Sequence, residues 1–159
     1  MARWHGARTR MSKATLYPPC HAPQLLGEQG LWAYELHSTV RAGFPSPAED
    51  FQSKRIDVLE RLVKHPQATY SMRVRGESMR EAGIFDGDVL LVDRAIKPEH
   101  GQIVVAVVDC EFTCKQLWLR SGHIKLKAAN PTFADITPSE GQTVEIWGVV
   151  IASVRQFKY

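Results

Sequence analysis

The spacing of apolar residues changes character near residue 68, and this change separates a helical pattern from a strand pattern. Upstream of it, apolar residues recur at helical spacing, which favours an amphipathic helix. These positions are Phe51, Val58, Leu59, Leu62 and Val63. Ser46-Pro47-Ala48-Glu49 is typical of a helix start, because Ser can cap, Pro suits the first helical position and Glu completes a capping box. His65-Pro66 is typical of a helix end, so one helix is predicted between these signals.

From Ala68 onward, apolar and polar residues alternate with the period of a β-strand. Tyr70, Met72 and Val74 alternate with polar neighbours, which predicts a half-buried strand. Further strands are predicted at 88–92, 102–108, 111–119, 124–127 and 144–154. Asp86-Gly87 indicates a tight turn and Asp109-Cys110 a hairpin turn. Many short strands after one N-terminal helix predict a mostly antiparallel β domain.

The first part of the chain lacks such a pattern. Residues 1–24 include prolines at 18, 19 and 23, which interrupt helices and central strands, so we expect a flexible N-terminal arm. The apolar and aromatic run Leu31–Leu36 is the exception. It could pack as a strand on the domain or on a partner.

Composition narrows the class of protein. With 159 residues the chain can bury one core, and 44% hydrophobic with 23% charged residues is ordinary for a globular protein. No apolar run approaches the roughly 20 residues that a membrane span needs. The basic N-terminus lacks the continuous apolar segment of a secretory signal, so we expect a cytoplasmic protein without a membrane anchor.

Charge and cysteine usage argue against two further kinds of site. Residues 1–42 hold five basic and two acidic side chains, which leaves 15 of each sign in residues 43–159, so the main domain is not an obvious phosphate-binding body. The three cysteines, Cys20, Cys110 and Cys114, have no metal-type spacing and favour reduced thiols. Asp86 and Asp88 flank a glycine, which favours turn residues over a metal site.

Ser78 and Lys115 are the candidate catalytic residues. Ser78 follows a predicted strand, between Gly76 and a turn, and a serine needs a base to become a good nucleophile. None of the six histidines lies in a setting that favours this role. Lys115 lies in an apolar strand, where burial would lower its pKa and leave a neutral amine, and Ser-Lys pairs are known in acyl chemistry. The spacing alone leaves the alternative that Ser78 forms a turn and Lys115 faces solvent or a sheet edge.

Alternation within 111–119 refines this hypothesis. Lys115 shares one face of the predicted strand with Thr113, Leu117 and Leu119. Two leucines beyond it on the same face are consistent with a desolvated amine.

Several blocks of the sequence, in order, resemble the LexA-like self-cleaving Ser-Lys peptidase family, and within it the UmuD-like members. The blocks are Gly76–Met79, Gly83–Asp88, Gly101–Ala106 and Phe112–Lys115. The similarity runs from about Gly43 to about Phe157. It implies that Ser78 is the nucleophile and Lys115 the base, and that no metal or organic cofactor takes part.

The resemblance also implies a cleavage bond, Ala42–Gly43, directly before Phe44-Pro45-Ser46-Pro47. Narrow flanks would let the carbonyl approach a nucleophile, and glycine permits a kinked backbone. From the residues alone, an ordinary glycine linker explains this stretch as well. Cleavage there would remove an arm, residues 1–42, and leave a peptidase-like domain, residues 43–159.

The same resemblance implies partners and a pathway. Cleavage would be stimulated by a RecA filament on single-stranded DNA, and the trimmed homodimer would join a UmuC-like translesion polymerase in the SOS response to DNA damage. It implies neither direct sequence-specific DNA binding nor membrane association.

Three alternatives are weighed against this hypothesis. A LexA-type repressor carries a helix-turn-helix domain before the cleavage bond, and residues 1–42 contain no recognisable helix pair. Type I signal peptidases use Ser-Lys chemistry but need a membrane anchor. A non-catalytic interaction module, in which Ser78 and Lys115 are only structural, stays open.

Overall fold

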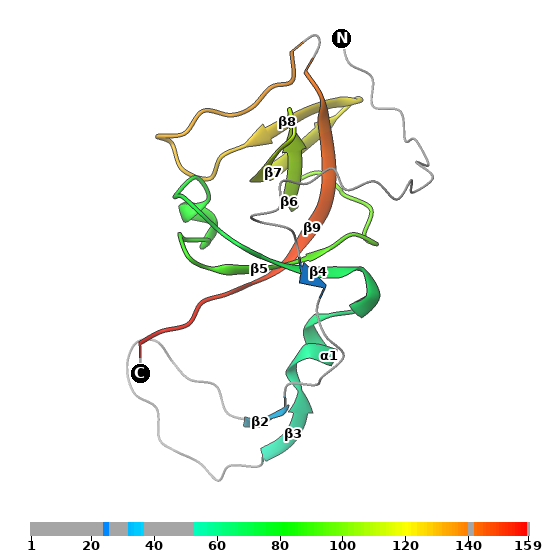
Figure 1. Ribbon diagram of the computed structural model, residues 1–159, viewed down its shortest axis with the longest axis vertical. Helices are drawn as coiled ribbons and strands as arrows, with labels where there is room; N and C mark the ends of the chain where they lie inside the picture. Colours follow the sequence, from blue (N-terminus) through cyan, green and yellow to red (C-terminus); the bar gives the residue numbers. More distant parts are fainter. Residues whose placement is uncertain (1–23, 26–31, 37–52, 140–141, 159) are drawn as a thin grey trace.

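The fold is dominated by one antiparallel sheet of seven strands, in the order β1-β4-β5-β9-β6-β7-β8, and a second sheet pairs β2 with β3 (Figure 1). The computed structural model describes residues 24–25, 32–36, 53–139 and 142–158. The strands are β1 (Gln24–Leu25), β2 (Trp32–Leu36), β3 (Ser53–Asp57), β4 (Thr69–Arg73), β5 (Val89–Asp93), β6 (Ile103–Val108), β7 (Glu111–Arg120), β8 (His123–Lys127) and β9 (Val144–Val154). The helices are α1 (Val58–Leu62) and the 3-10 turns η1 (Pro66–Ala68) and η2 (Arg80–Ala82). The predicted fold class, mostly antiparallel β, is confirmed.

The six strands predicted downstream of residue 68 are all present as β4 to β9. Their ends differ by only a few residues from the prediction, and β9 covers the predicted 144–154. The hairpin turn predicted between β6 and β7 is also present: Asp109 and Cys110 both have positive φ, 48° and 71°. Such values are typical of the tight turns that match strand twist.

β9 is the strand that joins the two halves of the sheet. It pairs with β5 on one side and β6 on the other, with a register shift in each ladder. Gly148 leaves space for β5, since a Cβ atom there would be 2.8 Å from Val92 Cγ1. In Figure 1, β4 and β5 cross below β6, β7 and β8, with β9 running through both groups. The two halves therefore face each other.

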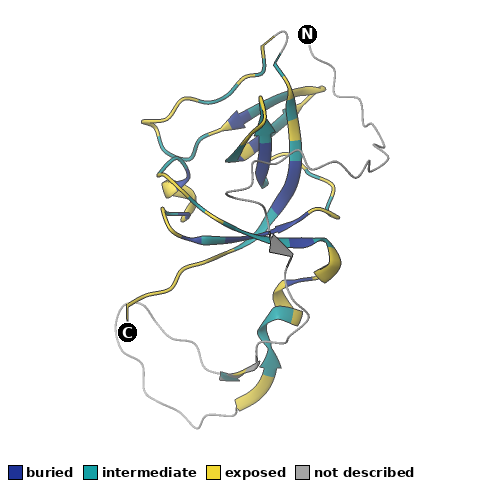
Figure 2. Ribbon diagram, in the orientation of Figure 1, coloured by how far each residue is buried: buried dark blue, intermediate teal, exposed yellow. Residues whose placement is uncertain are grey.

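Two clusters of buried side chains fill the interior, as the dark blue segments of β5, β6 and β9 in Figure 2 indicate. One cluster includes Trp147 of β9, whose ring meets Tyr70 and Phe112 edge-on at centroid distances of 5.1 and 5.6 Å. Met79 and Ile84 belong to the same cluster although they lie outside the strands. The loop after β4 is thus anchored in the core.

The predicted helix between Ser46 and His65 is wrong over residues 53–57. Those residues form β3, which pairs antiparallel with β2 from Trp32↔Asp57 to Leu36↔Ser53. Ile56 is the one apolar residue of β3, so this segment has no apolar helical face, and pairing with β2 supplies its backbone hydrogen bonds. The helix starts after Asp57, whose carboxylate accepts from the Leu59 N–H at 2.9 Å, and spans only Val58–Leu62. Residues 46–52 lie outside the described residues.

The N-terminal part contributes two strands. β2 confirms the strand predicted at 31–36, and its partner is β3 of the same chain. β1 was not predicted; it pairs with β4, Gln24 opposite Ser71. Within the described ranges no helix is long and apolar enough to cross a membrane.

Candidate active site

Ser78 lies in a loop between β4 and η2 that is closed at its base by backbone hydrogen bonds. The Gly87 N–H donates to the Val74 carbonyl at 3.1 Å, at the turn predicted from Asp86-Gly87. Gly76 has φ +90°, a value that favours glycine, and its N–H donates to the Asp86 carboxylate at 2.7 Å. The side chain and backbone of one turn therefore hold the loop that contains Ser78.

Met79, the residue after Ser78, anchors the loop in the hydrophobic core. The Met79 side chain is 2% exposed and packs in the core cluster around Trp147. The Met79 carbonyl accepts from the N–H groups of Ala82 and Ile84 at 3.0 and 3.2 Å. Burial of Met79 leaves Ser78 at the surface of the core, where a substrate could reach its hydroxyl.

Lys115 lies inside the seven-stranded sheet. Its backbone is opposite Val104 in the β6–β7 ladder, and its neighbour on the same face, Leu117, is fully buried. Lys115 itself is only 7% exposed. Burial lowers the pKa of the Lys115 ammonium below its ordinary value, because the charged form loses hydration. The structure thus gives Lys115 the desolvated environment predicted from alternation within β7.

The two candidate side chains meet. Lys115 Nζ lies 2.7 Å from Ser78 Oγ, a hydrogen-bond distance, although the residues are 37 positions apart in sequence. A neutral amine at this distance can take the hydroxyl proton, which is the arrangement that activates a serine nucleophile.

Two neighbouring groups oppose the effect of burial on Lys115, and both are weak. A negative charge on Cys114 or Asp135 would raise the Lys115 pKa. Burial, however, raises the pKa of the Cys114 thiol to about 11, so this thiol is neutral near pH 7. Asp135 forms an ion pair with Lys125 at 2.9 Å, which partly compensates its charge. Desolvation therefore dominates the titration of Lys115.

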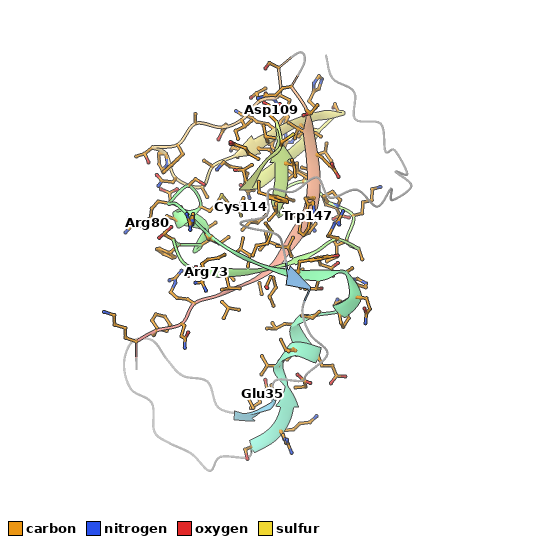
Figure 3. All side chains as sticks on the ribbon, in the orientation of Figure 1. Glu35, Arg73, Arg80, Asp109, Cys114 and Trp147 are labelled. Atoms are coloured by element: carbon orange, nitrogen blue, oxygen red, sulfur yellow. The ribbon has the colours of Figure 1, made fainter. Side chains whose placement is uncertain are left out.

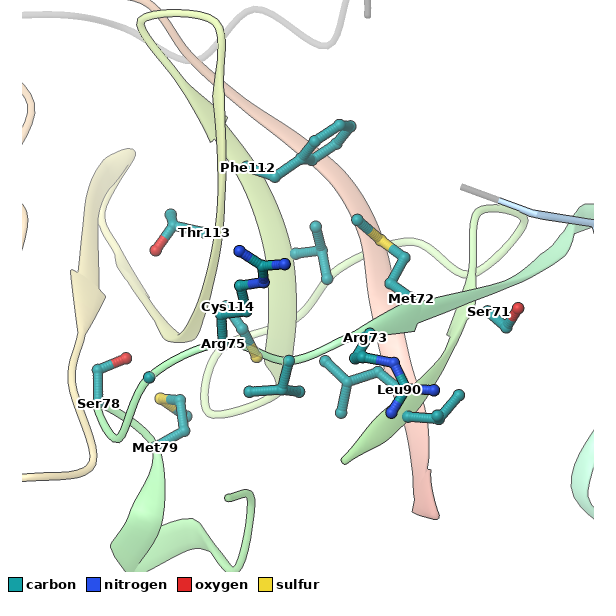
Figure 4. Close-up of a pocket in the computed structure, with 14 residues that line it drawn as sticks. Ser71, Met72, Arg73, Arg75, Ser78, Met79, Leu90, Phe112, Thr113 and Cys114 are labelled. Carbon is teal, nitrogen blue, oxygen red and sulfur yellow. The ribbon is translucent and has the colours of Figure 1, made fainter. Parts of the chain in front are cut away.

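A cleft of about 660 Å³ adjoins Ser78. Its lining comes from both halves of the sheet: β4 and the loop after it, β5 and β6, and the start of β7. Figure 4 shows Ser78 and Met79 at one end, with Met72 and Leu90 toward the other. Apolar side chains make up much of this surface, together with Arg73 and Arg75. A cleft of this size beside a nucleophile suits an extended peptide.

A buried ion pair stabilises the far end of the Ser78 loop, and it was not predicted from the sequence. Asp88 is 3% exposed and accepts from Arg155 Nε and Nη2 at 2.8 and 2.7 Å. The hydrogen bonds from Arg155, first of all, hold the pKa of the Asp88 carboxyl well below its usual range. Arg155 also donates to the Gly83 carbonyl at 3.0 Å. No sequence signal links positions 67 residues apart, so only the fold reveals this contact.

Asp86 lies in the turn predicted at Asp86-Gly87, whereas Asp88 follows that turn as part of the buried ion pair. Asp86 binds the Gly76 N–H, and Asp88 binds Arg155 and the Phe85 N–H. In the part of the chain that the structure describes, no three His, Cys, Asp or Glu side chains come together as a metal site would require.

The predicted cleavage bond, Ala42–Gly43, lies outside the described residues, in the segment that joins β2 to β3. The nearest described part is β2, where Glu35 forms an ion pair with Arg61 of α1. In Figure 3, Glu35 lies toward one end of the molecule, well separated from Cys114, which lines the cleft.

Comparison with known proteins places this geometry in context. Residues 35–151 match the model of the peptidase S24-like family. The chain is 43% identical to protein MucA of Salmonella typhimurium over 115 residues, which are 72% of this chain and 79% of MucA. It is 41% identical to protein SamA of the same species over 72% of this chain and 79% of SamA. It is 40% identical to the LexA repressor of Cupriavidus taiwanensis over 73% of this chain and 53% of the repressor.

Proposed function

The chain belongs to the peptidase S24-like family, and from this premise we propose that it is a serine peptidase that cleaves its own Ala42–Gly43 bond. Ser78 is the nucleophile and Lys115 the general base. The observation that carries the proposal is the 2.7 Å contact between Lys115 Nζ and Ser78 Oγ beside an open cleft. The part of the chain that matches the family model, residues 35–151, includes both Ser78 and Lys115.

The first half of the reaction forms an acyl-enzyme. Neutral Lys115 takes the proton of the Ser78 hydroxyl as Oγ attacks the Ala42 carbonyl carbon. The carbonyl oxygen becomes an oxyanion, which backbone N–H groups of the Ser78 loop stabilise. The tetrahedral intermediate then collapses, the C–N bond breaks, and the Lys115 ammonium returns its proton to the departing Gly43 amine.

The second half releases the arm. Water loses a proton to Lys115 and attacks the ester carbon, which frees the Ala42 carboxylate and restores the Ser78 hydroxyl. The products are residues 1–42 and residues 43–159. Because the bond and the nucleophile belong to one chain, tethering provides a high effective concentration, and no turnover is needed.

The wider role follows from the UmuD-like resemblance. The trimmed chain acts as a homodimer and as an accessory subunit of a UmuC-like translesion polymerase in the SOS response, and a RecA filament on single-stranded DNA stimulates cleavage. The similarity to MucA and SamA, at 43% and 41% identity over 72% of this chain, supports this role.

The test is to incubate the purified full chain at alkaline pH and to measure fragment masses. We expect two fragments that correspond to residues 1–42 and 43–159, and none from Ser78→Ala. RecA filaments should raise the rate at neutral pH. Wild-type protein that stays intact under all these conditions would favour the non-catalytic interaction module instead.

A further inference from the structure

A segment far along the chain holds the backbone around Ser78. The side-chain amide of Asn130 donates from Nδ2 to the Glu77 carbonyl at 2.9 Å. The Ala129 N–H donates to the Ser78 carbonyl at 2.8 Å, and the Ala129 carbonyl accepts from the Glu81 N–H at 2.8 Å. Three hydrogen bonds thus join residues 129–130 to the segment 77–81, which contains Ser78.

Two of these bonds determine where the neighbouring N–H groups point. A trans peptide group is planar, so its C=O and N–H point in opposite directions. The Glu77 carbonyl shares a peptide group with the Ser78 N–H, and the Ser78 carbonyl shares one with the Met79 N–H. Both carbonyls face residues 129–130, and the Glu77 carbonyl also accepts a longer bond, 3.3 Å, from the Arg80 N–H. Both N–H groups therefore point away from residues 129–130. Among the described residues neither N–H has an acceptor.

We propose that Asn130 is a positioning residue for the peptidase reaction: by binding the Glu77 carbonyl, it orients the N–H group of Ser78 toward the oxyanion. The inference rests on the proposed self-cleavage by Ser78 and Lys115. Asn130 contacts neither the Ser78 hydroxyl nor Lys115 in the hydrogen-bond network, and acts through the Glu77–Ser78 peptide group.

Asn is suited to this position because its side-chain amide has both a donor, Nδ2, and an acceptor, Oδ1. Oδ1 accepts from the N–H and the hydroxyl of Thr132, at 3.1 and 2.8 Å. These bonds fix the plane of the amide and leave Nδ2 facing Glu77. An aspartate would keep the acceptor for Thr132 but would lose the donor and place an oxygen against the Glu77 carbonyl.

The matched variants follow from these two roles. Asn130→Asp replaces the amide donor by a carboxylate oxygen and adds a negative charge, whereas Asn130→Ser shortens the side chain so that it cannot reach Glu77 and adds no charge. Thr132→Val is the milder variant, because it removes one of the two bonds that fix the amide plane but leaves the Nδ2 donor to Glu77. All three are compared with wild type as full chains, by the first-order rate constant of self-cleavage between neutral and alkaline pH.

We expect Asn130→Asp and Asn130→Ser to cleave roughly 10- to 100-fold more slowly at every pH, since loss of one oxyanion donor costs on the order of 100-fold or more and misorientation somewhat less. In Asn130→Ser the pH at which the rate is half-maximal should not move, because Lys115 is untouched and no charge is added. Thr132→Val should stay within about threefold of wild type. Thermal unfolding checks that each variant is folded. If Asn130→Asp does not fold, the comparison with wild type uses Asn130→Ser alone.

A second readout separates oxyanion stabilisation from general loss of structure. A peptide aldehyde with the sequence of residues 38–42 would form a hemiacetal at Ser78, with a new Oγ–C bond and an oxyanion in the same place. In Asn130→Ser its inhibition constant should rise by the factor by which cleavage slows. The corresponding peptide amide, which forms no adduct, should bind as it does to wild type.

The outcomes distinguish this inference from the proposed function. If wild type cleaves itself but Asn130→Ser cleaves at the same rate, shifts the half-maximal pH, or weakens aldehyde and amide alike, Asn130 is not a positioning residue while self-cleavage stands. If wild type does not cleave at all, the proposed function fails and this inference fails with it.

Discussion

The two members of the Ser78–Lys115 pair are held by different kinds of structure. Lys115 is part of a backbone ladder, with β6 beside it, and its side chain is surrounded by core residues. Ser78 lies in a loop with no ladder partner of its own. Its position depends on contacts from three distant places: Asp86, the segment 129–130, and the Asp88–Arg155 pair.

This difference predicts different responses to mutation. A ladder is made of main-chain bonds, so replacing the Lys115 side chain should change chemistry and leave the strand in place. The loop is held by a small number of individual contacts, several of them from side chains, so removing one such side chain should loosen the loop and slow the chemistry indirectly. The predictions below test this contrast in order of decreasing effect.

The largest effect is expected for Lys115→Met. Methionine has similar length and is apolar, so it suits a buried strand position, but it cannot accept the Ser78 proton. Self-cleavage should fall by at least about 1,000-fold, in the range seen when a nucleophile loses its base. Rate constants from gel densitometry or mass spectrometry measure this directly.

The same variant should be at least as stable as wild type. Since the Lys115 pKa is lowered in the folded protein, the folded state binds fewer protons than the unfolded state between that pKa and 10.5. Stability therefore rises with pH in this window for wild type, and Lys115→Met should lack that rise. A thermal midpoint well below that of wild type at pH 7 would show that the lysine, and not only the ladder, holds the strand.

The pH dependence of cleavage should be the next largest effect. Only neutral Lys115 accepts a proton, so the rate should climb about tenfold per pH unit while most of the lysine is charged. The rate should then level off below pH 10.5, the ordinary value for lysine. Stopped time courses across this range give the half-maximal pH. A rate that still climbs steeply at pH 10.5 would contradict a desolvated Lys115.

Arg155→Met tests whether the Ser78 loop depends on single side-chain contacts. It leaves the buried Asp88 carboxylate without its main partner and removes the bond to the Gly83 carbonyl. The guanidinium also stacks over Phe85, 3.8 Å from the ring centre. We expect the thermal midpoint to fall by several degrees and cleavage to slow severalfold. Arg120→Met, at an exposed position of β7, is the control and should change neither.

Acid pH should reduce the difference between Arg155→Met and wild type. The lowered Asp88 pKa contributes stability above the ordinary value of 3.8, and this is lost as pH falls through the folded-state pKa. Wild type should thus lose stability below about pH 4, while the variant, lacking that contribution, loses less. Parallel curves for the two proteins down to pH 2 would mean that Arg155 does not set the Asp88 pKa.

The strands could be predicted from the sequence, whereas the contacts that hold the Ser78 loop could not. Strands β4 to β9 and the hairpin turn at Asp109-Cys110 could be predicted because alternation and turn residues are local signals. The buried environment of Lys115 followed from the leucines on its own face of β7. The ties on the Ser78 loop could not be predicted, because Asn130 and Arg155 are brought there by the fold.

The error at the predicted helix has a physical cause of the same kind. Val58, Leu59, Leu62 and Val63 do lie in or beside α1, so the local spacing was informative there. What the spacing could not reveal was that β2, more than 15 positions upstream, pairs with residues 53–57. Pairing between distant segments overrides a weak local preference.

The smallest effect is expected for Cys114→Val. Cys114 lies next to Lys115 in β7, and its side chain lines the cleft. The Cys114 thiol is buried with a pKa of about 11, so it is neutral wherever cleavage is measured below about pH 10. A neutral thiol exerts no net charge on Lys115, and valine is a small apolar residue that suits a strand. We therefore expect stability to change by less than about 1 kcal/mol and the rate by less than about twofold. The half-maximal pH of cleavage should stay the same. If it shifts, the thiol takes part in the titration of Lys115, and burial alone does not explain the lowered pKa of the amine.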